Sequence, residues 1–158
     1  MVHDWAPRWS PDGKWIAYAV NINWDFQIFI VKSDGSQPPI QLTSDSGIHG
    51  GMDAYQVRGT IRWSPDSKDI IFTHMNHEKC SDIYVMSLND KIKKQITDHM
   101  PDELKKHKFA KPELIYYRSI DNLEIPAWLY RPIDAQNIQT PLVIYARANT
   151  KGLHVNGF

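Results

Sequence analysis

The sequence predicts a mainly β fold, made of two repeated four-stranded units that are followed by the first strands of an α/β domain. Three observations lead to this prediction. A motif near the N-terminus recurs further along the chain, each copy holds four short runs rich in β-branched and aromatic residues, and this rhythm stops after residue 98.

The repeat has a period of about 54 residues. The run Arg-Trp-Ser-Pro-Asp begins at Arg8 and again at Arg62. Gln-Leu-Thr at 41–43 corresponds to Gln-Ile-Thr at 95–97 with the same offset, and Ile-Phe-Ile-Val at 28–31 corresponds to Ile-Tyr-Val-Met at 83–86 with one more residue. Self-similarity of this length is typical of repeat architectures.

Each copy reads as four strands joined by tight turns. In the first copy we expect strands at 5–9, 15–20, 27–32 and 39–43, and the second copy keeps this order. Pro11 and Gly13 suit a type I turn between the first two strands, and Asp34-Gly35 suits a tight hairpin between the last two. Residues 5–43 and 60–97 are therefore expected to form similar antiparallel sheets.

Four antiparallel strands per repeat make the blade of a β-propeller, and the Trp-Ser-Pro-Asp repeat resembles the WD-like repeat of TolB-type propellers. Residues 1–98 are thus expected to form a partial β-propeller of two adjacent blades packed face to face. Two blades are fewer than a closed propeller needs, so we expect self-association through the unpaired blade faces.

Residues 44–59 connect the two copies and contain Gly47, Gly50, Gly51 and Gly59. This connection could line the mouth of the propeller. A solvated linker with one outer strand is favoured instead, because long loops are usually exposed.

The pattern changes after residue 98. Residues 99–111 are expected to form a linker with a short helix, because acidic residues begin it and lysines end it. Strands are expected at 113–119, 126–130 and 141–146. The last is a nearly unbroken apolar run, which favours a strand buried on both faces of an α/β sheet.

Residues 112–145 resemble the start of the hydrolase domain in the prolyl oligopeptidase family, of which the acylaminoacyl-peptidase branch is the most similar. The resemblance rests on Pro112-Glu113, Tyr-Arg-Ser-Ile-Asp-Asn at 117–122, Ile-Pro-Ala-Trp-Leu-Tyr-Arg-Pro at 125–132 and Pro-Leu-Val-Ile-Tyr at 141–145. It implies a propeller followed by an α/β-hydrolase domain at 112–158, which in full-length relatives cuts peptides with Ser, Asp and His.

The chain departs from this family in the motifs that carry out catalysis. Arg-Ala-Asn-Thr at 147–150 stands where the family has His-Gly-Gly-Pro, and no Gly-x-Ser-x-Gly motif occurs. We therefore assign no catalytic residue and expect a truncated, inactive chain whose full-length relatives bind peptides. The alternative is a TolB-like propeller that binds or scaffolds, but a third repeat should begin near residue 116, where Tyr116 stands.

Composition excludes several other classes. Eighteen basic and eighteen acidic residues cancel, so a nucleic-acid partner is not expected. No apolar run is long enough for a membrane span, and no membrane partner is expected. Cys80 is the only cysteine, which favours the cytoplasm.

His74, His77 and Cys80 have the spacing H-x-x-H-x-x-C, which could supply metal ligands. They fall at an expected hairpin turn, where incidental polar residues are common, so we assign no metal, cofactor-binding or other ligand site. The remaining histidines and the basic run at 105–108 are interpreted as solvated surface.

Overall fold

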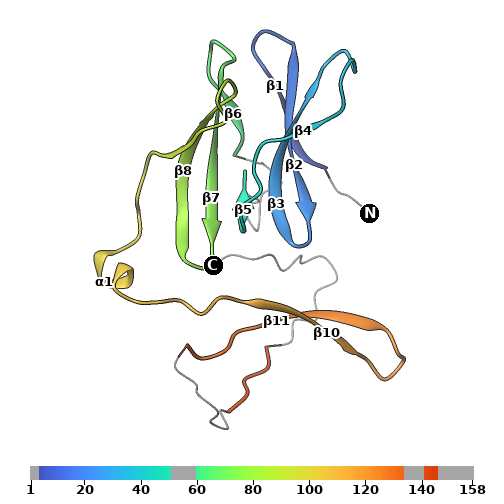
Figure 1. The fold of residues 1–158 in the computed structure, drawn as a ribbon, viewed down its shortest axis with the longest axis vertical. Coiled ribbons are helices and arrows are strands. Elements are labelled where there is room, and N and C mark those ends of the chain that lie inside the picture. Colours follow the sequence, from blue (N-terminus) through green and yellow to red (C-terminus); the bar gives the residue numbers. More distant parts are fainter. Residues whose placement is uncertain (1–3, 51–59, 134–140, 146–158) are drawn as a thin grey trace.

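The computed structural model describes residues 4–50, 60–133 and 141–145, and it is mainly β (Figure 1). Two units contain four strands each, in the same order and all antiparallel, as the repeat predicts. The first unit comprises β1 (Asp4–Trp9), β2 (Trp15–Ile22), β3 (Asp25–Lys32) and β4 (Ile40–Gln41). The second comprises β6 (Arg62–Trp63), β7 (Asp69–Asn76), β8 (Lys79–Ser87) and β9 (Lys93–Gln95).

The turn after the Trp-Ser-Pro-Asp motif has the same construction in both units. The hydroxyl of Ser10 accepts a hydrogen bond from the Trp15 amide at 3.0 Å, and the hydroxyl of Ser64 accepts one from the Asp69 amide at 2.9 Å. Gly13 adopts a positive φ of 71°, and its counterpart Ser67 adopts 61°. The motif is therefore a turn signature that fixes how the first two strands of each unit meet.

The connection between the units differs from the prediction of a solvated linker. Residues Ile48–His49 form β5, which pairs in parallel with β3 and antiparallel with β7. Both residues of β5 are buried, and the strand lies between β3 and β7. The two units are consequently one continuous sheet through β5 rather than two separate sheets. Residues 51–59, including Gly51 and Gly59, lie outside the described residues.

β5 and β6 lie along the same edge of β7. His49 is opposite His74, and Trp63 is opposite Ile70. The amide of Gly50 donates to the Thr73 carbonyl at 2.8 Å, which continues the ladder between these two pairs. The strand position on this edge of β7 is thus filled by two short strands, β5 and β6.

One apolar core serves both units. Because side chains alternate along a strand, every second residue of the central strands points inward. Members come from β2, β3, β5, β7 and β8 and from the residue just before β6, so the core crosses the boundary between the units. They are Ala17, Ala19, Phe26, Ile28, Ile30, Ile48, Ile61, Ile70, Phe72, Tyr84 and Met86.

Two hydrogen bonds also cross the boundary, near the motif turns. The Trp63 indole donates to the Arg8 carbonyl at 2.9 Å, and the Asp12 amide donates to the Ser67 hydroxyl at 3.1 Å. Trp9 occupies the same repeat position as Trp63, yet it is 61% exposed. Trp63 therefore packs between units, as its repetition suggests, whereas Trp9 does not.

The segment after the second unit is more open. A one-turn helix, α1 (Asp102–Lys105), leads to a hairpin of β10 (Glu113–Arg118) and β11 (Glu124–Leu129), which lies below the two units in Figure 1. None of the described helices is long and apolar enough to span a membrane.

The buried strand predicted at 141–146 is not observed. Residues 141–145 form no strand, and their side chains from Leu142 to Tyr145 are at least 72% exposed. A central strand needs a neighbour on each side and a layer over each face. Within the described part of the chain this segment has none of them, and residue 146 lies outside that part.

Gly50 offers a test of how tightly β5 is held. Gly13 and Gly50 share a φ of 71°, so Ala at either position incurs similar backbone strain, but only at Gly50 would the new Cβ approach a side chain, Ile61 Cγ1 at 2.7 Å. We expect Gly50→Ala to lower the free energy of unfolding by about 1–3 kcal/mol more than Gly13→Ala. Urea unfolding measures both, and equal losses would contradict tight packing at β5.

Candidate functional site

The described residues bring four polar side chains together at the boundary between the units. His74 lies on β7, on the face that also carries Ile70 and Phe72, so its ring points into the core. His49 is paired with it across the ladder from β5. The two rings stack with centroids 4.0 Å apart and planes 8° apart, and both residues are at most 2% exposed. A buried, stacked histidine pair therefore forms the centre of the site.

His49 makes polar contacts at both ring nitrogens. Its Nδ1 is 2.9 Å from the Phe26 carbonyl oxygen, and its Nε2 is 3.1 Å from Oδ1 of Asp45. Neither oxygen can donate to the ring, because one is a carbonyl and the other belongs to a carboxylate. Nζ of Lys93 is 3.5 Å from the same Nε2, so an acceptor and a donor both approach this nitrogen.

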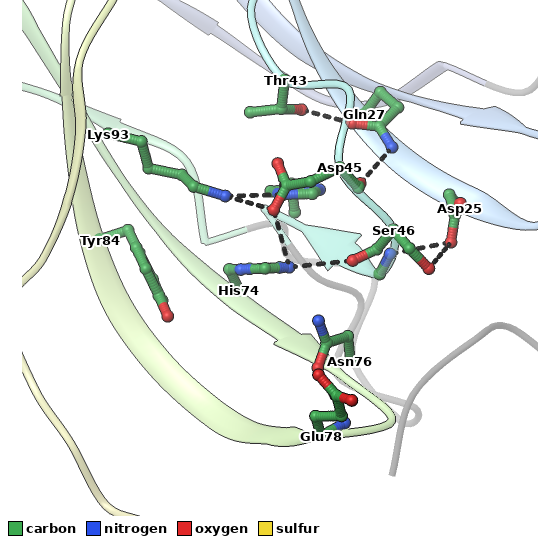
Figure 2. A network of polar contacts seen from close by, with 12 residues as sticks. Asp25, Gln27, Thr43, Asp45, Ser46, His74, Asn76, Glu78, Tyr84 and Lys93 are labelled. Carbon is green, nitrogen blue, oxygen red and sulfur yellow. Dashed lines mark hydrogen bonds and ion pairs between the residues drawn. The ribbon is translucent and has the colours of Figure 1, made fainter. Parts of the chain in front are cut away.

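Asp45 joins the units through its side chain. Its backbone carbonyl accepts a hydrogen bond from Gln27 of the first unit at 2.9 Å. Its Oδ2 is 2.5 Å from Nζ of Lys93 on β9 in the second unit (Figure 2). Burial raises the pKa of the Asp45 carboxyl, but the hydrogen bonds and charges of His49 and Lys93 outweigh this and hold the pKa well below its usual range. Asp45 is therefore ionised, and its carboxylate contacts both Lys93 and the His49 ring.

His74 behaves differently from its stacked neighbour. Its Nε2 lies 3.3 Å from the Ser46 carbonyl oxygen, whereas its buried Nδ1 has no hydrogen-bond partner (Figure 2). Burial and the nearby charges of His49 and Lys93 lower the pKa of His74 from 6.5 to about 4. His74 is thus neutral near pH 7, with its hydrogen on the nitrogen that faces Ser46.

Asp45, His49 and His74 are also the right residue types for a transition-metal site, since their donor atoms lie within 4.8 Å of one another. The geometry does not fit. A metal lies in the plane of each imidazole that binds it, but these two planes are nearly parallel and stacked, so they share no point near both nitrogens. The Lys93 ammonium already serves as the cation beside Asp45.

The equivalent position in the second unit has different chemistry. Thr43 and Thr97 each bond back to the start of the third strand, to Gln27 in the first unit and Asp82 in the second. Asp82 also accepts a hydrogen bond from Nδ1 of the exposed His99 at 2.8 Å. His99 is the repeat equivalent of Asp45. The Asp45 side chain contacts Lys93 of the next unit, whereas the His99 side chain contacts Asp82 of its own unit.

The structure separates the residues of the H-x-x-H-x-x-C spacing. His74 stacks on His49, whereas Nε2 of His77 is 3.6 Å from Oε1 of Glu78. Cys80 is a free thiol on β8. His107 and the basic run at 105–108 lie on the exposed linker, and His154 is outside the described residues. Sequence reasoning missed Asp45, His49 and Lys93, because pairing across β5 and β9 has no local signal.

Comparison with known proteins decides the family. Residues 3–112 match the model of the dipeptidyl peptidase IV (DPP IV) N-terminal region, which is more than half of the chain. The chain belongs to this family. Membership in the DPP IV N-terminal region family confirms the predicted resemblance to the propeller of a prolyl oligopeptidase-family peptidase. No curated protein is similar enough to count as a match.

Solved structures share this fold at low identity. Dipeptidyl peptidase 4 of Porphyromonas gingivalis is 15% identical with a TM-score of 0.57, over 81% of this chain and 17% of that protein. A variant of the AtxE2 isopeptidase with Astexin3-dC4 bound is 16% identical with a TM-score of 0.63, over 97% of this chain and 22% of that protein. The chain therefore spans about a fifth of the length of the structures it matches.

Asp45 should contribute to the stability of this DPP IV-type region. In Asp45→Asn, His49 and Lys93 lose their shared counter-charge, and because Asp45 is half exposed we expect a loss of about 1–2 kcal/mol near pH 7. A carboxyl with a lowered pKa stabilises the fold above its ordinary pKa of 3.8, so the deficit should shrink below that pH.

Urea unfolding across this pH range tests the expectation. Glu113→Gln is the control, because its ion pair with Arg131 is exposed, and it should change stability little. A deficit for Asp45→Asn that persists unchanged in acid would contradict the electrostatic explanation.

Proposed function

We propose that the chain supplies propeller blades and the first strands of the hydrolase domain to a serine peptidase of the prolyl oligopeptidase family, and that these 158 residues alone do not hydrolyse peptides. The family match over residues 3–112 carries this proposal. Two further observations support it: structures that share the fold include a dipeptidyl peptidase and an isopeptidase, and the match ends where the β10–β11 hairpin is about to begin.

The proposed inactivity follows from the chemistry of acyl transfer. A serine peptidase needs a nucleophilic Ser, a His that accepts its proton and an acid that orients the His. No Gly-x-Ser-x-Gly motif occurs in the 158 residues. The buried His49 and His74 contact the carboxylate of Asp45 and backbone carbonyl oxygens. The propeller part would position or select peptide substrates rather than cleave them.

We expect no labelling of the 158 residues by a serine-directed fluorophosphonate probe and no hydrolysis of acylated peptides. The complete reading frame that contains these residues should encode a protein that is labelled at a Ser within Gly-x-Ser-x-Gly, and this protein serves as the positive control. Labelling of the 158 residues with turnover would overturn the proposed inactivity. A complete product that is never labelled would overturn the peptidase assignment.

We also propose that the chain self-associates through the uncovered side of the first unit. Trp9 is exposed there, whereas the equivalent Trp63 is packed against the first unit through its bond to Arg8. An exposed aromatic side chain at a position that is otherwise used for packing favours association.

Trp9→Ser should shift the chain toward the monomer in sizing chromatography with light scattering. Ile120→Ser is the control, because Ile120 is fully exposed on the β10–β11 turn, and it should leave the distribution unchanged. A wild-type chain that is monomeric throughout would contradict this proposal.

A further inference from the structure

We propose that Asp45, His49, His74 and Lys93 form a proton-dependent latch between the two four-stranded units, which is closed near neutral pH and opens in mild acid. This latch is independent of peptidase activity. It rests on the position of the cluster at the boundary, on the stacking of its two histidines and on the lack of a partner for one ring nitrogen.

The latch groups come from both sides of the boundary. Asp45 is anchored to the first unit through Gln27, and its carboxylate reaches Lys93 of the second unit. His49 bonds to the Phe26 carbonyl of the first unit and stacks on His74 of the second. The contacts from Asp45 to Lys93 and from His49 to His74 therefore help to hold one unit against the other.

The groups that face the two rings come from β7, β8, β9 and the segment after β4. Asp45 follows β4, Lys93 lies on β9, and Tyr84 of β8 approaches His74 edge-on with centroids 5.2 Å apart. Phe72 of β7 contacts His49 and cannot titrate. Burial and neighbouring carboxylates, Asp82 first, raise the pKa of Tyr84, so this phenol stays neutral in the acid range. The charges that act on the rings are thus Asp45 and Lys93.

The surroundings of the stacked pair oppose a proton on His74. That proton would go to Nδ1 of His74, which is buried and has no acceptor. It would also place a positive charge near the Lys93 ammonium, in a ring whose centroid is 4.0 Å from that of His49. Protonation of His74 is therefore disfavoured while the latch is closed.

Opening of the latch exposes the His74 ring to solvent, where it can bind a proton, so the equilibrium between the closed and open forms depends on pH. The pKa of His74 is about 4 in the closed form, against an ordinary value of 6.5 once the ring is solvated. A lowered histidine pKa stabilises the closed form above 6.5, and this stabilisation is lost as the pH falls toward 4. Asp45 acts in the same direction at lower pH, because its carboxyl loses its charge there.

The remaining contacts decide what kind of motion follows. The bonds from Trp63 to Arg8 and from Asp12 to Ser67 contain no group that titrates in this range. They lie at the end of the boundary with the motif turns, away from β5 (Figure 1). The apolar core also continues across the boundary. Mild acid should consequently loosen the β5 end first and leave the turn end joined.

Hydrogen exchange with mass spectrometry on the full chain tests the latch. From about pH 7.5 to about pH 5, and after correction for intrinsic rates, we expect protection at residues 46–50 and 93–95 to fall about 10- to 30-fold, as the two values of the His74 pKa require. Protection of β2 should change little. Equal losses throughout both units would indicate general acid unfolding and would overturn the proposal.

Two variants separate the latch from other histidines. His74→Gln can still donate to the Ser46 carbonyl but cannot titrate, so protection at 46–50 should no longer depend on pH. His99→Gln is the matched control, because His99 is exposed and pairs with Asp82 within its own unit, and it should keep the wild-type response. A reversed pattern would overturn the proposal.

Histidine NMR on the wild-type chain provides an answer even if His74→Gln does not fold. The His74 imidazole should remain neutral well below its ordinary pKa while protection at 46–50 already falls, because the proton binds the open form. Titration of His74 near 6.5 with full protection retained would overturn the latch.

Discussion

The two-residue strand β5 is the constraint on which the rest of the structure depends. Ile48 pairs with β3 on one side and with β7 on the other, so a single backbone segment supplies hydrogen bonds to both units. Because β5 is buried, its amides and carbonyls have to be paired, and β3 and β7 supply the partners. The shared core, the stacked histidines and the position of Asp45 all follow from β5 being held between the sheets.

The repeat provides one scaffold with two chemistries. In both units a threonine two residues after the fourth strand bonds to a side chain of the third strand, which fixes the outer strand. The neighbouring positions are free to differ. Asp45 reaches across the boundary to cations of the next unit, whereas His99 turns back to Asp82. Function can therefore diverge at equivalent positions without altering the strands that carry them.

The sequence predicted what local rules determine and missed what long-range pairing determines. The strands of each unit follow from alternation and from the Ser10 and Ser64 turns, and these elements agree with the structure. Loop length alone favours a solvated linker with one outer strand around His49, and β5 is only two residues long. Its burial depends on β3 and β7, which are brought together only by the fold.

The same reasoning explains the candidate site and the last predicted strand. The spacing of His74 to His77 and Cys80 is visible in the sequence, but its structural partner is His49, which lies 25 residues earlier and is placed opposite it by the register of β5 on β7. Residues 141–145 have the composition of a central strand, yet composition alone cannot supply the neighbours that such a strand requires.

The bond from the Trp63 indole to the Arg8 carbonyl has a geometric consequence. Arg8 directly precedes the tryptophan of the first unit, so donor and acceptor sit at different places in the repeat, and the contact is head-to-tail. Such a heterologous contact has no two-fold partner: repeated with a constant rotation it either closes into a ring or continues as an open filament. The rotation between neighbouring units, more than the strength of any one bond, therefore determines whether copies of this contact end or propagate.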